Sequence, residues 1–280
     1  MIVFSNSVFA KSVGELSNRN GLFYEPFSPN LANGTYETYY ANGQLSIIAT
    51  YKDGIKEGPF KEHYPNGQLY LKSTMKDGKL DGPYWEYFDN GQLREKVTYK
   101  DGQWHGVYEY YEKDGKPIKK ISYKDGIEDG LFEEYFDNGQ LLEISTYKDG
   151  IKEGPYKTYH PNGQLKYKTT YIDGIEDGPF VMYHENGQLQ VRGTAKDEKG
   201  EGPQEVYYEN GQLQARLTYK DGEEDGPQEG YYENGQLQAR LTYKDGIMDG
   251  LQESYEKDGT LITKAFYVNG DRFECEGKCN

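Results

Sequence analysis

The sequence predicts an all-β protein, a single-layer, twisted antiparallel meander of about ten 24-residue β-hairpins that forms an open, curved repeat array. Glycine recurs every 24 residues, from Gly43 and Gly67 onward to Gly259, and a second glycine series keeps the same step. Nearly every unit also holds an Asn-Gly step between alternating residues, which is a strong hairpin signal. The chain has 29 Tyr and 35 Gly but only 35% hydrophobic residues, a composition that favours turn-rich strands over a thick core.

Charge and hydropathy narrow the class of protein. The net charge of −15 would also fit a disordered chain, but aromatic residues make up 15% of the sequence, and disordered chains lack them. An excess of 47 Asp and Glu over 32 Lys and Arg repels phosphate backbones, so we expect no nucleic-acid partner. No run of 18 apolar residues occurs, and we therefore expect no transmembrane segment.

The first 33 residues differ in composition from the rest. Residues 1–10, MIVFSNSVFA, end like a secretory signal that lacks its basic region, and we interpret them as a signal-peptide remnant; an ordinary terminus is the alternative. This interpretation predicts an exported protein, periplasmic, surface-bound or secreted, rather than a cytoplasmic one. Residues 11–33 contain Leu22-Phe23-Tyr24 and are predicted to cap the array irregularly, because an exposed edge strand recruits other chains.

Residues 34–273 hold the repeats without insertion or deletion, each as strand, tight turn, strand and loop. A two-residue type I′ turn at Asn66-Gly67 would place Tyr64 opposite Leu69 and Glu62 opposite Leu71. The later Lys-Asp-Gly step predicts a longer loop of about five residues. In this register one face carries Phe60, Tyr64, Leu69, Leu71 and Met75, and the other carries Lys61, His63, Tyr70, Lys72 and Thr74.

Three kinds of departure from the pattern occur. In 195–202 the turn glycine is displaced two places to Gly200, which predicts a bend or hinge. The early aromatic residue becomes Gln204, Gln228 and Gln252 in the last units, and we expect looser packing there. Lys116-Pro117 replaces the usual leucine step and should weaken strand pairing locally.

The tail 274–280 carries the two cysteines of the chain, Cys275 and Cys279. Export would permit a small disulfide loop between them, and free thiols are the alternative. A zinc site needs about four ligands, so we expect no metal.

The repeat pattern G-x-[YF]-x-x-[YF]-[YF]-x-N-G-x-L…Y-K-D-G resembles the MORN-repeat variant family of many bacterial proteins, which includes YwqK-like proteins described as antitoxins. The resemblance extends over 34–273. It implies a curved β-hairpin array that serves as a scaffold or binding surface. It also suggests an antitoxin that binds and neutralises a partner toxin, although an exported protein would be oddly placed for that role.

Two columns on the second face suggest a binding stripe. A tyrosine recurs once per unit, and a Lys or Arg lies diagonal to it on the facing strand, within reach for a cation–π contact. Such a stripe could hold an elongated acidic or sugar-like ligand; alternatively, it only keeps a one-layer sheet soluble. The candidate binding residues are Tyr87, Tyr111, Tyr135, Tyr159, Tyr183, Tyr207, Tyr231, Lys96, Lys120, Lys168, Arg192, Arg216 and Arg240.

Nothing in the sequence points to catalysis. His63, His105, His160 and His184 form no catalytic set, and the carboxylates of 125–130 lack the spacing of a calcium loop. We therefore predict a non-enzymatic scaffold without cofactors that binds a protein or an elongated ligand on its sheet. The alternatives are the antitoxin role and a cell-wall or carbohydrate-binding role, and the sheet edges offer a route to self-association.

Overall fold

The computed structural model describes residues 11–12 and 16–274, and this part of the chain contains strands and no helix, hence no helix long and apolar enough to cross a membrane. Residues 1–10, on which the export prediction depends, and the disulfide candidates Cys275 and Cys279 lie outside the described residues. The chain divides into two compact units, residues 1–139 and 140–280.

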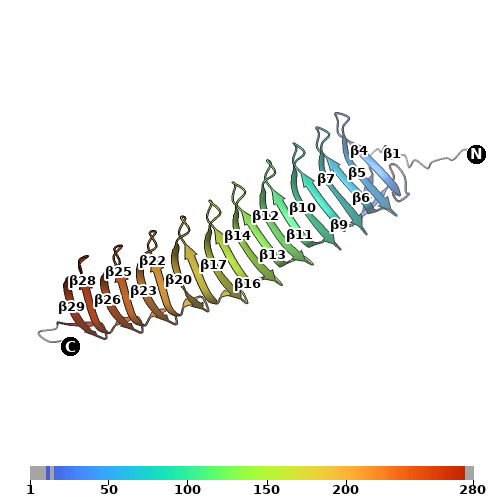
Figure 1. Ribbon diagram of the computed structural model, residues 1–280. Coiled ribbons are helices and arrows are strands. Elements are labelled where there is room, and N and C mark those ends of the chain that lie inside the picture. The colour runs from blue at the N-terminus through green and yellow to red at the C-terminus, as the bar shows by residue number, and fades with distance from the viewer. Residues whose placement is uncertain (1–10, 13–15, 275–280) are drawn as a thin grey trace, which may run out of the picture. The chain divides into compact units, whose positions relative to one another are not determined.

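Unit 1 is an antiparallel meander behind a small cap (Figure 1). From β4 to β13 successive strands pair antiparallel, and β7 pairs with both β8 and β9. The short β1 runs parallel to β4, and β2 and β3 form a separate hairpin. The strands are β1 (Lys11–Ser12), β2 (Ser17–Arg19), β3 (Leu22–Tyr24), β4 (Gly34–Tyr39), β5 (Leu45–Lys52), β6 (Ile55–His63), β7 (Leu69–Lys76), β8 (Lys79–Leu80), β9 (Gly82–Tyr87), β10 (Leu93–Lys100), β11 (Gln103–Tyr111), β12 (Pro117–Lys124) and β13 (Ile127–Tyr135).

Unit 2 continues the same repeat and confirms the predicted fold class of antiparallel β-hairpin repeats. In most repeats a bulge divides the strand before the Asn-Gly turn into a short and a long piece, as in β15 and β16. The strands are β14 (Leu141–Lys148), β15 (Ile151–Lys152), β16 (Gly154–Tyr159), β17 (Leu165–Ile172), β18 (Ile175–Glu176), β19 (Gly178–Tyr183), β20 (Leu189–Lys196), β21 (Lys199–Gly200), β22 (Gly202–Tyr207), β23 (Leu213–Lys220), β24 (Glu223–Glu224), β25 (Gly226–Tyr231), β26 (Leu237–Lys244), β27 (Ile247–Met248), β28 (Gly250–Tyr255), β29 (Leu261–Val268) and β30 (Asp271–Glu274).

The β2–β3 hairpin packs on the first repeat of unit 1. The Phe23 amide donates to the Gly54 carbonyl at 2.8 Å, and the Phe23 ring lies 5.0 Å from the ring of Tyr51. Ala32 and Tyr36 are 0% and 3% exposed beneath this contact. The largest buried cluster of unit 1 therefore lies where the cap meets the sheet.

The Asn-Gly turn is not the predicted two-residue type I′ turn. The amide of Tyr64 donates to the carbonyl of Gln68 at 2.8 Å, and Gly67 donates back to Tyr64 at 2.8 Å, so the loop holds three residues. Gly67 has a φ of +86°, whereas Asn66 is not in the left-handed region. This is the three-residue hairpin in which a type I turn is followed by a left-handed glycine. Asn66 instead spans two turns, because its Nδ2 donates to the Asp89 carbonyl of the next repeat at 3.1 Å.

The tight type I′ turn lies at the Asp-Gly step, where a five-residue loop was predicted. Asp53 and Gly54 both have positive φ, 50° and 80°, and they connect the paired residues Lys52 and Ile55. The preference of type I′ turns for Asp-Gly is as strong as for Asn-Gly, so the sequence signal applied to both turns. The three-residue turn also forms at Asp114-Gly115. In both turns the side-chain oxygen of the residue before glycine accepts from the amide two positions on, at 3.0 Å for Asn66 and 3.1 Å for Asp114.

The register is confirmed in the strand and wrong at the turn. Glu62 pairs with Leu71 as predicted, but Leu69 pairs with His63 and not with Tyr64, because the loop is one residue longer. A bulge absorbs the difference by setting two residues of β7, Tyr70 and Leu71, opposite one residue of β6.

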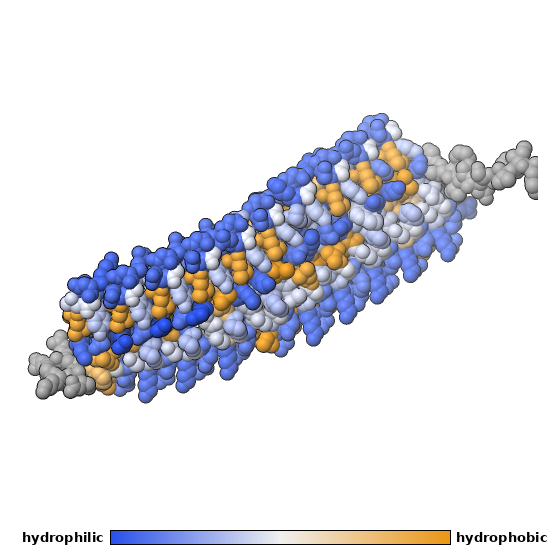
Figure 2. Space-filling view, viewed as in Figure 1, coloured by the Kyte–Doolittle hydropathy of each residue, from blue (hydrophilic) through white to orange (hydrophobic). Residues whose placement is uncertain are grey.

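The bulge changes which face each side chain occupies. Tyr70 joins the face of Leu71, and its ring lies 5.1 Å from that of Tyr64, whereas Leu69 lies on the face of His63. We call the first face the aromatic face; it carries Tyr36, Phe60, Tyr84, Tyr108, Phe132, Tyr156 and Phe180. The second is the charged face, with the tyrosine column and the Lys and Arg column of the predicted stripe. In Figure 2 both rims are hydrophilic, and hydrophobic patches recur between them.

Most aromatic residues of the aromatic face lie opposite a small residue, a pattern that the sequence interpretation missed; Tyr84–Val97 and Tyr108–Ile121 are the exceptions. Tyr36 pairs with Ala49, Phe60 with Ser73, and Phe180 with Gly193, where an added Cβ would lie 2.9 Å from the Phe180 ring. Leucine replaces the small residue opposite two of the three glutamines, in Gln204–Leu217 and Gln228–Leu241, whereas Gln252 pairs with Ala265.

The expected loosening is wrong for Gln228. This residue is 3% exposed. Its side-chain oxygen accepts from the Thr218 amide at 3.2 Å, and its side-chain nitrogen donates to the Thr218 carbonyl at 3.0 Å. The exchange of an aromatic–small pair for a glutamine–leucine pair keeps the volume of the pair roughly constant, which is the change that cores tolerate best.

Residues 195–202 contain no displaced turn. Lys196 pairs with Lys199, and Asp197 and Glu198 take the two turn positions with φ of 50° and 64°. Gly200 serves packing, because an added Cβ would approach the Tyr219 ring at 3.3 Å. The displaced turn from which the hinge was predicted is therefore wrong, and Glu198 adopts a conformation that normally requires glycine. Pro117 likewise keeps its pairing with Tyr111, because it is the first residue of β12.

Replacing Glu198 with glycine should stabilise the protein. A non-glycine residue in the left-handed region costs about 1 kcal/mol, and the substitution removes that cost. The urea midpoint of unfolding should rise, with an unchanged slope. Lys199→Gly is the matched control: it places glycine in a strand and should lower the midpoint. A fall in the midpoint for Glu198→Gly would contradict the strain at this turn.

The pair Phe180–Gly193 should show reciprocal exchange. Gly193→Leu alone overfills the site and should cost about 1–3 kcal/mol of stability. Adding Phe180→Gln reproduces the natural pair Gln204–Leu217 and should recover most of the loss. A double-mutant cycle of unfolding free energies measures the coupling. Additive effects would show that the two columns pack independently.

Candidate functional site

A row of alternating charges crosses the charged face of unit 2. In this row Arg192, Arg216, Arg240 and Lys264 alternate with Glu205, Glu229 and Glu253 on neighbouring strands. Each glutamate therefore has a cation opposite it on both sides. The sequence interpretation found the cations and missed the glutamates, although these also recur at one position of the repeat.

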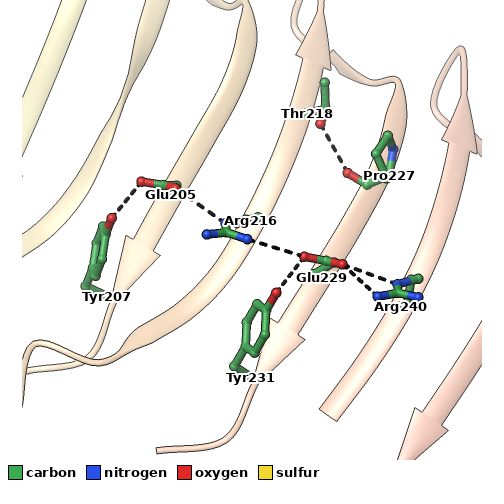
Figure 3. Close-up of polar contacts among 8 residues, drawn as sticks. All are labelled: Glu205, Tyr207, Arg216, Thr218, Pro227, Glu229, Tyr231 and Arg240. Carbon is green, nitrogen blue, oxygen red and sulfur yellow. Dashed lines mark hydrogen bonds and ion pairs between the residues drawn. The ribbon is translucent and has the colours of Figure 1, made fainter. Parts of the chain in front are cut away.

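Hydrogen bonds connect this row to the tyrosine column (Figure 3). The Tyr207 hydroxyl donates to Glu205 at 2.6 Å, and Arg216 Nε donates to the other carboxylate oxygen at 3.4 Å. Glu229 accepts from the Tyr231 hydroxyl at 2.5 Å and from Arg240 Nη2 at 3.1 Å. The carboxylates thus satisfy both the tyrosines and the arginines of the predicted stripe.

The pKa values of the three row glutamates are shifted in the direction that these hydrogen bonds predict. The hydrogen bond from Tyr207 holds the pKa of Glu205 below its ordinary value, and Tyr231 has the same effect on the pKa of Glu229. Tyr255 lowers the pKa of Glu253 in the same way. All three glutamates are therefore ionised at neutral pH and accept hydrogen bonds only.

Unit 1 has the same arrangement on β10 to β13. Lys96 Nζ lies 3.0 Å from Glu109, and Lys120 Nζ lies 3.6 Å from Glu133. Tyr111 donates to Glu109, and Tyr135 donates to Glu133 at 2.6 Å. The predicted cation–π contact is also present, since Lys120 Nζ lies 5.7 Å from the centre of the Tyr135 ring.

Four predicted binding residues lie outside this network: Tyr87, Tyr159, Tyr183 and Lys168. Two residues before each tyrosine, the position that elsewhere holds glutamate is occupied by Trp85, Lys157 and Val181, respectively. Within residues 16–274, the hydroxyls of these three tyrosines have no hydrogen-bond partner. Lys168 faces Lys157 on one side and Val181 on the other. The predicted stripe thus divides into residues engaged by glutamates and residues left without them.

A shallow hollow lies on the charged face next to two of these interruptions, at Trp85 and at Val181. The hollow of unit 1 has a volume of about 390 Å³, and its charged-face wall includes Pro83, Trp85, Lys96, Thr98, Val107 and Glu109. The hollow of unit 2 has a volume of about 370 Å³ and includes Pro179, Val181, Arg192, Thr194, Pro203 and Glu205. Each combines apolar walls with one cation and one carboxylate.

Charged groups on the aromatic face are held internally. Glu86 is 7% exposed and accepts from the Tyr84 hydroxyl at 2.9 Å and from Arg94 Nη1 at 2.7 Å. Lys152 Nζ lies 4.2 Å from the centre of the Tyr156 ring and 3.2 Å from Glu143. These charges are held by partners within the sheet. The aromatic face also has a hollow of about 340 Å³ where the cap meets the sheet, but its lining, which includes Phe23, Tyr36 and Tyr51, is mostly apolar, and Lys56 is its one charged residue.

The histidines that replace the rim tyrosine have a structural role. His160 and His184 contact the carbonyls of Tyr183 and Tyr207 through Nε2 at 2.9 Å and 3.0 Å. The Tyr208 hydroxyl makes the equivalent bond to Tyr231 at 2.8 Å. Across the described ranges, no group of three or more His, Cys, Asp and Glu side chains is placed to hold a metal ion.

Fold and site together define a repeat scaffold, an open array of β-hairpins whose side chains form rows across the sheet. The chain belongs to the MORN repeat variant family, whose model matches it ten times in tandem. The matched residues are 32–53, 56–77, 80–101, 104–125, 128–149, 152–173, 176–197, 200–221, 224–245 and 248–269.

Solved structures offer only remote likenesses. The TCP10 domain of Danio rerio CPAP, in complex with a peptide of Danio rerio STIL, is 14% identical with a TM-score of 0.29, covering 84% of this chain and 100% of that one. A TcdB2-TccC3-Cdc42 structure is 12% identical with a TM-score of 0.20, covering 83% and 14%. An alternansucrase in complex with isomaltononaose is 16% identical with a TM-score of 0.19, covering 88% and 20%. No curated protein sequence matches the chain.

Removing the glutamates of the row should destabilise the protein in a pH-dependent way. Their folded-state pKa values are lowered, so their contribution is present above the unfolded value of about 4.3 and is lost as the pH falls through the folded value. The variant Glu205→Gln, Glu229→Gln, Glu253→Gln should unfold at lower urea concentration than wild type at pH 7. This difference should shrink toward pH 3.

The matched control changes three exposed glutamates of the Asn-Gly turns, Glu185→Gln, Glu209→Gln and Glu233→Gln. It should leave the midpoint at pH 7 nearly unchanged, because exposed carboxylates away from a network contribute little. A difference between the row variant and wild type that stays constant from pH 7 to pH 3 would argue against ionised glutamates in the row.

Proposed function

We propose that this protein is a non-enzymatic scaffold that binds a protein partner on its charged face. The observation that carries the proposal is the row of exposed, ordered charges at strand spacing. Arg216 and Arg240 expose 57% and 48% of their side chains, although both are held by glutamates. A rigid pattern of alternating charge favours partners with the complementary pattern and repels others, which gives specificity more than affinity.

The charged face suits this role better than the aromatic face. Rings of the aromatic face pack against one another, as in Tyr156–Tyr171 with centres 5.4 Å apart and Tyr84–Tyr99 at 5.5 Å. Apolar side chains also project from the charged face, among them Val107 and Leu131 at 49% and 44% exposure. Exposed apolar groups beside ordered charges are the composition of a polar protein interface.

A protein partner is favoured over a carbohydrate by the state of the two tryptophans. Lys72 Nζ lies 4.3 Å from the centre of the Trp85 ring, and Trp104 stacks on Tyr108 at 4.9 Å. Each ring has one face occupied by the protein itself, which leaves less aromatic surface for a sugar. The antitoxin role would be a special case of this proposal, with a toxin as the bound protein, and export would place the binding face outside the cytoplasm.

Site-specific photo-crosslinking tests which face binds. A photoreactive phenylalanine at Leu131 projects from the charged face, and one at Glu134 projects from the aromatic face of the same strand, β13. In lysate of the source cells, we expect a specific crosslinked protein from position 131 and none from position 134. Crosslinks confined to position 134 would contradict the proposal. A turnover activity that one substitution abolishes would contradict the non-enzymatic part.

A further inference from the structure

The alternation of charges in the row fails once in each unit. In unit 1 Lys61 stands directly opposite Lys72, and in unit 2 Lys157 stands directly opposite Lys168. Like charges at directly opposed positions of a sheet are destabilising. Six other repeats place glutamate at the position of Lys61 and Lys157, so substitution of these lysines by glutamate should recover the stability that the two lysine pairs cost.

No carboxylate in the row compensates either lysine pair. Ile48 lies beyond Lys61, and Trp85 lies beyond Lys72. In unit 2 the corresponding neighbours are Ile144 and Val181. None of the four lysines forms an ion pair within residues 16–274. Each pair is therefore a local positive patch on a chain whose net charge is −15.

The two patches are the same site built twice. Each residue of the first has a counterpart 96 residues later, four repeats of 24, since 157 − 61 = 96 and 168 − 72 = 96. The same offset relates Ile48 to Ile144 and Trp85 to Val181. It also relates the charged-face residues of the two hollows one by one. A lysine pair with an adjoining hollow thus recurs as a set.

Hydrogen-bond donors complete each site. The row position next to each pair holds Trp85 or Val181 in place of glutamate, and the hydroxyls of Tyr87 and Tyr183, also 96 residues apart, are consequently not engaged. Lysine ammonium groups and phenol hydroxyls all donate to anionic oxygens. The hollow beside them offers Pro83 and Val107 in unit 1, and Pro179 and Pro203 in unit 2, as apolar walls.

We propose that each lysine pair with its hollow binds an acidic peptide segment of the partner protein. Two carboxylates of the segment lie on the lysines, and an apolar side chain enters the hollow. A basic residue then meets Glu109 or Glu205 on the far wall. This assignment rests on the proposed function and names the chemistry of its partner. A long phosphate chain fits less well, because the far-wall glutamate and the net charge of −15 both repel it.

The test measures binding of a fluorescein-labelled peptide, acetyl-Gly-Ser-Asp-Glu-Leu-Arg-Ser-Gly-amide, to the full chain by fluorescence anisotropy at low salt. We expect saturable binding with two sites per chain. The double variant Lys61→Glu, Lys157→Glu restores alternation in both units and should lower the peptide affinity at least tenfold. Its unfolding midpoint should equal or exceed that of wild type, which separates lost binding from lost folding. Lys61→Glu alone should leave one site.

The matched control is Lys76→Glu, Lys196→Glu. These lysines also face lysines, Lys79 and Lys199, but across the two-residue turns Asp77-Gly78 and Asp197-Glu198, so the control makes the same change in charge away from the row. It should keep the affinity within twofold of wild type. An equal loss in the control, or unchanged affinity in Lys61→Glu, Lys157→Glu, would overturn the proposal, as would tripolyphosphate that displaces the peptide and binds more tightly. A partner crosslinked at Leu131 alongside any of these results would leave the proposed function standing.

Discussion

The hydrogen bonds that connect the turns of successive repeats along both rims are the constraint on which the structure depends. A single-layer sheet has no second layer to hold its strands in place, and both rims supply the missing order. On one rim, Tyr64 and Asn66 donate to the carbonyls of Tyr87 and Asp89 in the next repeat, at 2.8 Å and 3.1 Å. On the other, the Gly78 amide of the type I′ turn donates back to Lys56 at 3.0 Å. Each repeat is thereby held in the same register as the one before it.

Because the register is fixed, residues at one repeat position form continuous rows across the sheet. These rows determine which side chains lie opposite each other on each face. On the aromatic face, the volumes of two facing side chains must fit together, and Phe180 therefore requires Gly193 opposite it. On the charged face the constraint appears as alternating sign, so that Glu205 is shared by Arg192 and Arg216. A residue that breaks either rule is conspicuous, because neighbouring repeats show what the position normally holds. The lysine pairs break the rule of sign in both units, at equivalent places.

The sequence predicted the fold class and the strand register, because glycine spacing and alternation are local signals. It did not separate the two turns, since Asn66-Gly67 and Asp53-Gly54 carry equal preference for the type I′ conformation. Asn66 contacts Asp89 in another repeat, but Asp114-Gly115 forms the same three-residue turn without an Asn. The Lys and Arg residues of the stripe were predicted because a cation near a tyrosine ring is recognisable from residue type and spacing alone. Their partners such as Glu229 were overlooked, although the predicted register already places Glu229 opposite Arg240. Only the second cation, Arg216, comes opposite Glu229 through the shift in register after the Asp-Gly turn, which the pattern does not reveal.

The alternating row also governs how such an array lengthens. The stretch YYENGQLQARLTYKDG stands at 207–222 and again at 231–246. Each copy brings one arginine, Arg216 or Arg240, and the eight residues between the copies bring Glu229. Copying one repeat therefore inserts a neutral Glu–Arg step, which leaves the net charge of the row unchanged and the lysine pairs intact. The array can grow by whole repeats in this region at little electrostatic cost, whereas an insertion between the lysine pairs would alter the four-repeat interval that separates them.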